Sequence, residues 1–258
     1  MRRGNEPRVD DEHALRADHT PEAIATRLET PPGHGHVRDL VFGAIDGTVT
    51  TFAVVAGAAG ANLRTSVVIV LGVANLVADG FSMAVSNFLG TRTELRQRET
   101  TRLEELRQVH VVPDGEVEEV RQILSRKGFR GDDLERAVDV ITSDIDVWIE
   151  TMLTDEHGLA STPPDPVRAG AATFAAFLVV GFVPLMAFVA DALGIVDLAH
   201  PFGWSAALTA CTFFAVGAAK GRIVDEPWPT AGVETLVIGG AAATLAYVVG
   251  AVLGDLVR

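Results

Sequence analysis

The sequence has little of what most enzymes and secreted proteins need. It contains one cysteine, Cys211, within an apolar run, which excludes an intramolecular disulfide and a cysteine-rich metal cluster and predicts a buried packing thiol. It has no glycine-rich phosphate loop, no nucleophile elbow and no pair of histidine ligands on one helix. We therefore expect neither an enzyme nor a prosthetic group. The formal net charge of −13 also argues against nucleic acid as a partner.

Charge is almost absent from five long stretches of the chain. These apolar runs cover residues 40–61, 67–90, 169–190, 201–219 and 235–254. Each is close to the roughly 20 residues that a helix needs to cross a bilayer. The expected fold class is an all-α integral membrane protein with five transmembrane helices. Pro184 predicts a kink or break in the third of them.

The segment between the second and third runs has a different composition. Residues 94–166 carry eighteen Asp and Glu against nine Lys and Arg, so they are expected to lie in water. Helical spacing predicts a three-helix insert: a continuation of the second span, a helix from Pro113 to Gly128, and a helix from near Asp132 to Gly158. We divide the chain into a flexible tail (1–36) with a short helix through PEAIATRLE, spans one and two (37–91), the insert (92–166) and spans three to five (167–258).

Basic residues predict the orientation in the membrane. Arginines follow the second run and precede the third, and Lys220 and Arg222 follow the fourth. The positive-inside rule therefore places the insert and the N-terminus in the cytoplasm. The first residues lack the apolar core of a cleavable signal peptide, so we expect an unprocessed N-terminus. The lack of a recognisable sorting signal favours a prokaryotic plasma membrane.

Two of the apolar runs contain a lone carboxylate. A charge in hydrocarbon costs roughly 3 kcal/mol and is tolerated where it faces protein, water or an ion. Asp46 lies near the start of the first span, and Asp79 and Met83 lie one helical turn apart in the second. A thioether beside carboxylates favours a first-row divalent metal such as Fe²⁺ or Mn²⁺. The alternative is that Met83 only fills the membrane core.

The insert contains a second group of side chains that can bind metal. Glu116 and Glu119 stand at i,i+3 in a first helical turn, where the helix dipole alone also favours acids. Met152 and Glu156 stand at i,i+4 in the next helix, and His157 follows. With the acids that end the preceding helix, these side chains predict an Fe²⁺, Mn²⁺ or Zn²⁺ site of modest affinity.

The stretches DGTVTTFAVVAGAAG and LVADGFSMAVSNFLGTRTE resemble the first two spans of the vacuolar iron transporter family, and W-x-x-x-M-L-x-x-E-x-G-L extends the resemblance through the insert. It implies a homodimeric carrier of cytosolic Fe²⁺ or Mn²⁺ with a path at Asp46 and Met83. It also implies a cytoplasmic metal site at Glu105, Glu116, Glu119, Met152 and Glu156. The chain departs from the family at Gln108 and Leu153, which replace a glutamate and a methionine. Gln108 offers a neutral oxygen, and His157 is a further possible ligand.

These observations together predict a carrier that exports Fe²⁺, and also Mn²⁺, from the cytoplasm in exchange for protons. Its partners would be divalent metal ions, protons, the lipid bilayer and a second copy of the chain. Asp79 joins the expected transport path because it shares a helix face with Met83. The alternative is a membrane-anchored metal sensor or buffer, which needs the insert but not the carboxylates of the spans.

Overall fold

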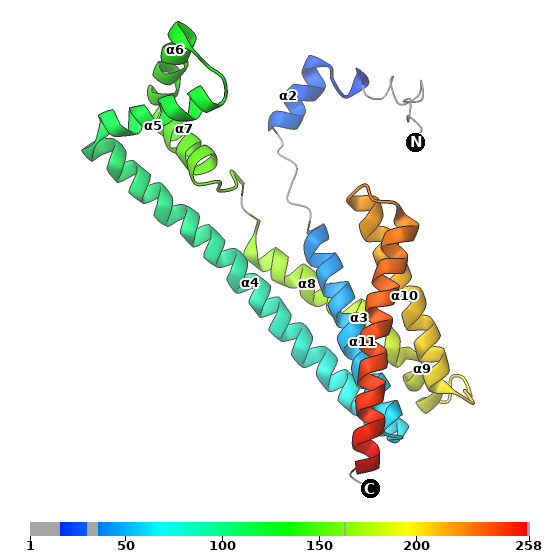
Figure 1. Cartoon of the computed structure of the whole chain (residues 1–258). Helices are drawn as coiled ribbons and strands as arrows, with labels where there is room; N and C mark the ends of the chain where they lie inside the picture. Colours follow the sequence, from blue (N-terminus) through cyan, green and yellow to red (C-terminus); the bar gives the residue numbers. More distant parts are fainter. Residues whose placement is uncertain (1–15, 30–35, 163, 257–258) are drawn as a thin grey trace.

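The computed structural model describes residues 16–29, 36–162 and 164–256, and within them it is helical without strands (Figure 1). The short helix expected near the N-terminus is present as α2 (Pro21–Glu29). The helices that follow are α3 (Val37–Gly60), α4 (Thr65–Val111), α5 (Pro113–Arg126), α6 (Gly131–Thr142), α7 (Ile145–Thr151), the π-helix η1 (Met152–Glu156), α8 (Pro166–Gly181), α9 (Val183–Ala192), α10 (Pro201–Ile223) and α11 (Trp228–Leu256). The all-α prediction is confirmed.

Helices α3, α4, α10 and α11 are long and apolar enough to cross a membrane. Helices α8 and α9 pass the same test only as a pair, and they meet at an angle of 49°. The described residues thus contain four spans, or five if the bent pair counts as one. Pro184 lies in the first turn of α9, where its missing N–H and fixed φ are tolerated, so the expected break near Pro184 is confirmed.

Small residues let the membrane helices approach at backbone distance. A methyl group added at Gly47 would lie 2.6 Å from the carbonyl oxygen of Phe177 on α8, and one at Gly250 would overlap the carbonyl oxygen of Gly57 on α3. Gly47 and Gly250 therefore let α3 pack closely against α8 and α11 within one chain. The predicted buried position of Cys211 is wrong, because its side chain on α10 is exposed on the surface of the bundle.

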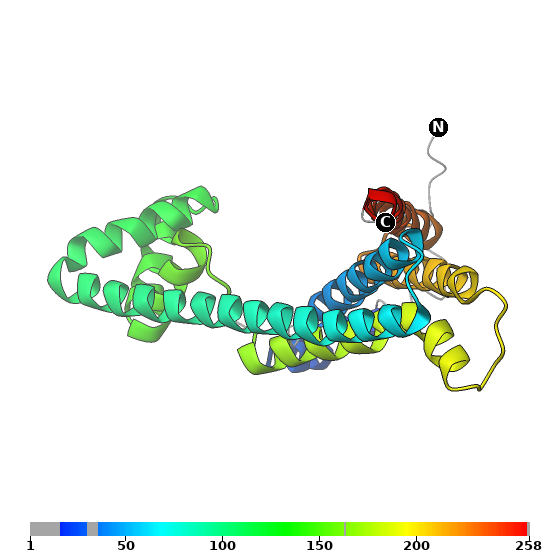
Figure 2. The same cartoon turned by 90° about the horizontal axis from the view of Figure 1, so that it is seen from below.

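One helix connects the membrane bundle to the insert. Helix α4 runs for 47 residues without a break, and Figure 2 shows it as a single rod that leaves the bundle and carries the insert at its far end. The insert closes around a small apolar core that includes Val109, Val120, Val138, Trp148 and Met152. Two ion pairs then tie α7 to α4, Arg98 with Glu150 at 2.5 Å and Arg102 with Asp146 at 3.2 Å.

The single third helix predicted for the insert is wrong. The chain breaks between α6 and α7, where Oδ1 of Asp144 accepts hydrogen bonds from the backbone N–H groups of Asp146 (2.9 Å) and Val147 (3.2 Å). An aspartate in this position caps a new helix and competes with continuation of the old one. A final π-helical turn follows α7, and it ends at Gly158 with a positive φ of 65°.

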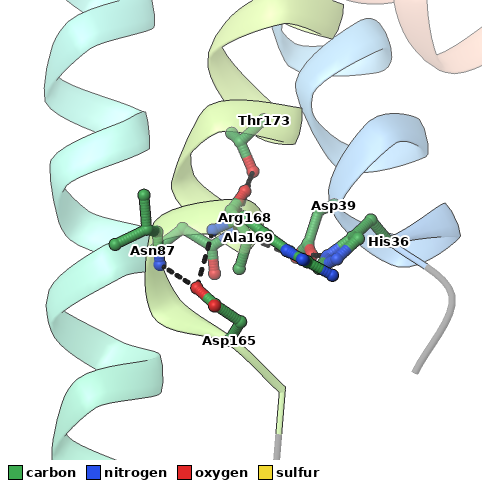
Figure 3. A network of polar contacts seen from close by, with 8 residues as sticks. His36, Asp39, Asn87, Asp165, Arg168, Ala169 and Thr173 are labelled. Atoms are coloured by element: carbon green, nitrogen blue, oxygen red, sulfur yellow. Dashed lines mark hydrogen bonds and ion pairs between the residues drawn. The ribbon is translucent and has the colours of Figure 1, made fainter. Parts of the chain in front are cut away.

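A network of polar side chains lies where α4 leaves the bundle (Figure 3). The side-chain amide of Asn87 on α4 lies 2.9 Å from Oδ1 of Asp39 on α3 and 2.7 Å from Oγ1 of Thr173 on α8. The other oxygen of Asp39 lies 3.3 Å from Nδ1 of His36. These partly buried side-chain hydrogen bonds favour one relative placement of the three helices.

The tight contact at Gly250 gives a prediction for stability. Gly250→Ala places a methyl group against the backbone of α3, so we expect the protein to lose about 1–3 kcal/mol of stability. Thermal unfolding in detergent, followed by circular dichroism, measures the loss. Gly240→Ala on the same helix is the matched control, since a methyl group there meets nothing within 4 Å. Equal melting temperatures for both variants would contradict the packing described here.

Candidate functional site: an acidic cluster in the insert

The cluster is assembled from three segments of the insert. Helix α4 contributes Glu105 near its end, and α5, which begins at Pro113, contributes Glu116 in its first turn. The π-helical turn brings Glu156 and His157 to the same place. Nε2 of His157 lies 2.8 Å from Oε1 of Glu105 and 3.9 Å from Oε2 of Glu156. One ligand atom from each of these three residues lies within 4.8 Å of the other two.

Two of these carboxylates are buried almost completely. The exposed fraction is 3% for Glu105 and 2% for Glu116. With both acids ionised, Oε2 of each residue accepts no hydrogen bond from the residues that the structure describes, although a protonated Glu116 can hydrogen-bond to Glu105. An acceptor buried in this way costs free energy, and the cost is larger for a charged group. The cluster therefore concentrates negative charge in a buried place with few donors to offset it.

The charges of the cluster act on one another. Burial, and then the negative charge of Glu119, raises the pKa of Glu116 from 4.5 to about 7. The charges of Glu105 and Glu156 and a hydrogen bond with Glu105 add to the shift. Partial burial and the charge of Glu119 also raise the pKa of Glu156, which His157 partly opposes. Acids that share one site disfavour each other's ionisation, and a divalent cation removes that repulsion.

The structure brings together most of the predicted insert residues. Glu119 is exposed at the edge of the cluster, and Gln108 is half-buried on α4 about one turn from Glu105. Met152 is fully buried and packs with Val120 and Val138 in the apolar core beside the cluster. Its thioether therefore has a packing role in this structure. The part of Met152 and Gln108 in metal binding stays a prediction.

The residues predicted inside the membrane form a second group on α3 and α4. Asp46 is half-buried, and Asp79 is the charged group that acts on it electrostatically. Asp79 is exposed on the surface of the isolated chain, whereas Met83 packs against the apolar core of the bundle. The packing alternative for Met83 therefore has support, and its part in a transport path stays a prediction.

Asp46 also lines a groove that the sequence reasoning did not find. The groove has a volume of about 480 Å³ and runs between the start of α3 and the end of α10, where Lys220 lies among its lining residues. Asp39 and the Asn87 network of Figure 3 were missed as well, although Asp39 stands two turns before Asp46 on the same face of α3. That spacing was the signal available in the sequence.

The fold and the two groups of side chains define a class of protein: a helical membrane protein with acidic side chains both within its spans and in a helical insert. The sequence profile of the VIT family matches residues 37–251. A vacuolar iron transporter of Toxoplasma gondii is 33% identical over 226 residues, which cover 84% of this chain and 74% of that protein. Vacuolar iron transporter 1 of Arabidopsis thaliana is 29% identical over 217 residues, 82% of this chain and 83% of the relative. The chain belongs to the VIT family.

The raised pKa of Glu116 gives a prediction for stability against pH. The folded protein binds this proton more tightly than the unfolded chain, so its stability falls as pH rises from 4.5 to about 7. Glu116→Gln removes that loss, and we expect it to stabilise the metal-free protein at pH 8 by on the order of 1–3 kcal/mol, with little effect at pH 4. Thermal melts at the two pH values measure the difference.

The neighbouring residue on α5 offers the control for this prediction. Glu118 is exposed and pairs with Arg121, which lowers the pKa of Glu118, so Glu118→Gln should bring no gain at pH 8. Addition of a divalent metal should reverse the order and stabilise the wild type more than Glu116→Gln. A wild type whose melting temperature is the same at pH 5 and pH 8, and does not respond to metal, would contradict the unsatisfied cluster.

Proposed function

We propose that this protein is a divalent metal transporter that moves Fe²⁺, and also Mn²⁺, out of the cytoplasm. The observation that carries the proposal is the pair of buried carboxylates, Glu105 and Glu116, whose Oε2 atoms have no partner among the described residues. A cation of two charges is the ligand that such a site lacks. The relatives named above, which are called vacuolar iron transporters, support iron as the cargo.

Helix α4 supports transport rather than binding alone. It carries Glu105 of the insert cluster, and in its membrane part Asp79 and Met83. Asp79 and Asp46 interact electrostatically across the seam between α4 and α3. A carboxylate inside the membrane costs free energy, and such residues are therefore typical of sites that bind an ion or a proton. In the proposed mechanism the insert captures metal, and Asp46, Asp79 and Met83 receive it in the membrane.

A second copy of the chain completes the proposed path. Asp79 is exposed on the isolated chain although it lies in an apolar helix, and an exposed carboxylate in a span needs protein or water beside it. A homodimer in which α3 and α4 of both copies meet would provide that cover. Proton antiport is part of the proposal because carboxylates in a low-dielectric path exchange a metal ion for protons.

The direction of transport in the proposal combines the orientation of the chain in the membrane with the export from the cytosol that the family resemblance implies. Arginines such as Arg92 and Arg96 follow the membrane part of α4, so the insert and the N-terminal end of α3 are assigned to the cytoplasm. The guanidinium of Arg92 lies 5.8 Å from the ring centroid of Phe88, an arrangement suited to the membrane interface. The prokaryotic plasma membrane is the proposed location.

A metal sensor or buffer is the second candidate function. One observation favours it: the acidic cluster is built from the insert alone, and none of its members comes from the membrane part of a helix. In that case the spans would only anchor the chain. The two functions differ in their need for Asp46.

Transport in proteoliposomes distinguishes the two functions. We expect the wild type to carry Fe²⁺ and Mn²⁺ with counterflow of protons, and Asp46→Asn to lower the flux at least about tenfold, since the neutral amide has lost the charge that offsets the cation in the membrane. Metal-sensitive and pH-sensitive dyes inside the vesicles measure both flows. Asp255→Asn at the exposed end of α11 is the control and should transport normally.

The insert variant Glu116→Gln/Glu119→Gln should raise the metal concentration needed for half-maximal flux and change the maximal flux less. A wild type that binds metal in the insert but carries none across the bilayer would establish the sensor.

A further inference from the structure

The hydrogen-bond partner of the buried Glu105 is the imidazole of His157, and a nitrogen ligand affects which metal ions a site prefers. We propose that His157 is a ligand of the metal captured by the insert, and that it shifts the selectivity of this site toward Fe²⁺, Co²⁺, Ni²⁺ and Zn²⁺ and away from Mn²⁺, Mg²⁺ and Ca²⁺. The inference rests on the proposed function, because it concerns the site that captures the cargo.

The ligand atoms of the cluster lie close to the spacing of ligands that share one ion. Nitrogen and oxygen ligands bind Zn²⁺ at about 2.0–2.2 Å, so two neighbouring ligand atoms lie about 3–3.5 Å apart. Nε2 of His157 lies 2.8 Å from Oε1 of Glu105 and 3.9 Å from Oε2 of Glu156, on the two sides of this range. The three ligand atoms lie within 4.8 Å of one another, so rotations of their side chains would let them surround one ion.

The buried carboxylates point to an ion independently of these distances. Oε1 of Glu105 accepts from His157, but Oε2 of the same carboxylate is buried without a partner in the described chain, as is Oε2 of Glu116. A histidine that served only as the partner of Glu105 would leave both Oε2 atoms without a hydrogen-bond donor. A cation held by His157, Glu105 and Glu156 would bring positive charge to the buried carboxylates.

The local backbone explains why His157 reaches the cluster. The helix that begins at Ile145 widens into the π-helical turn of η1, and π-turns occur frequently at functional sites. The backbone N–H of His157 closes this turn on the carbonyl oxygen of Met152 at 3.2 Å, and Gly158 then reverses the chain. The side chains of His157 and Glu156 are 36% and 40% exposed, which leaves an approach from solvent to the buried Glu105.

The donor set decides which metals the site prefers. Carboxylate and carbonyl oxygens suit Mg²⁺, Ca²⁺ and Mn²⁺, whereas imidazole suits Zn²⁺, Cu²⁺, Fe²⁺ and Ni²⁺. Met152 packs in the apolar core and Leu153 offers no ligand atom, so no thioether favours softer metals in this structure. His157 therefore supplies the nitrogen donor that separates Fe²⁺ from the hard cations.

Electron spin echo spectroscopy of Mn²⁺ bound to the purified full-length protein in detergent tests the ligation directly. A coordinated imidazole gives a ¹⁴N modulation, which we expect in the wild type and not in His157→Gln at equal metal occupancy. His110→Gln is the matched control, because His110 is exposed on α4 and its Nδ1 lies 2.6 Å from the backbone oxygen of Leu106. This variant should keep the signal.

Binding affinities test the selectivity. We expect His157→Gln to weaken Co²⁺ binding at least about tenfold and Mn²⁺ binding about threefold or less, because Co²⁺ gains more from imidazole. Equilibrium dialysis with each metal alone measures both. A wild type that binds Mn²⁺ without ¹⁴N modulation would overturn the proposal even if the variant failed to fold. Equal losses for Co²⁺ and Mn²⁺ would overturn the selectivity.

The test of His157 as a ligand and the test of transport can give different results. A protein that shows imidazole ligation but no flux in vesicles would keep His157 as a ligand and contradict transport. A protein that transports through Asp46 without imidazole ligation would support transport and contradict the role of His157 as a ligand. A wild type that binds no metal in the insert would overturn both the role of His157 and the capture step.

Discussion

The burial of acidic side chains without a matching cation is the constraint on which the insert depends. Glu105 and Glu116 lie in the interior of a bundle whose apolar core is small, and each has a carboxylate oxygen without a partner among the described residues. A chain that only needed a stable bundle would fill these positions with apolar side chains, which avoid the desolvation of a charge. The proposed metal ion would supply the positive charge that offsets this cost.

The same constraint applies to the membrane part, and α4 connects the two. Asp46 and Asp79 interact across the seam of α3 and α4, and Glu105 lies farther along the same unbroken helix as Asp79. Backbone contacts at Gly47 and the amide of Asn87 fix α3, α4 and α8 relative to one another. The position of the insert is therefore coupled through one rigid element to the carboxylates in the bundle.

Much of this architecture could be predicted from sequence, because it follows from local rules. The apolar runs predict the membrane helices, Pro184 the break in the bent pair, and Pro113 the start of α5. The break at Asp144 was missed because continuous helical spacing extends through it, and only the competition of a capping side chain ends α6. The exposure of Cys211 was missed because an apolar run does not show which of its faces packs within the chain.

The candidate site divides in the same way. The spacing of Glu116 and Glu119 and of Met152 and Glu156 could be predicted, but the π-helical turn that joins His157 to Glu105 depends on tertiary packing.

X-ray diffraction at the absorption edge of Co²⁺, from crystals of the full-length protein grown with that ion, tests the central claim most directly. The account predicts an anomalous peak within ligand distance of Glu105, Glu156 and His157. An ordered insert with no peak at this cluster would contradict it.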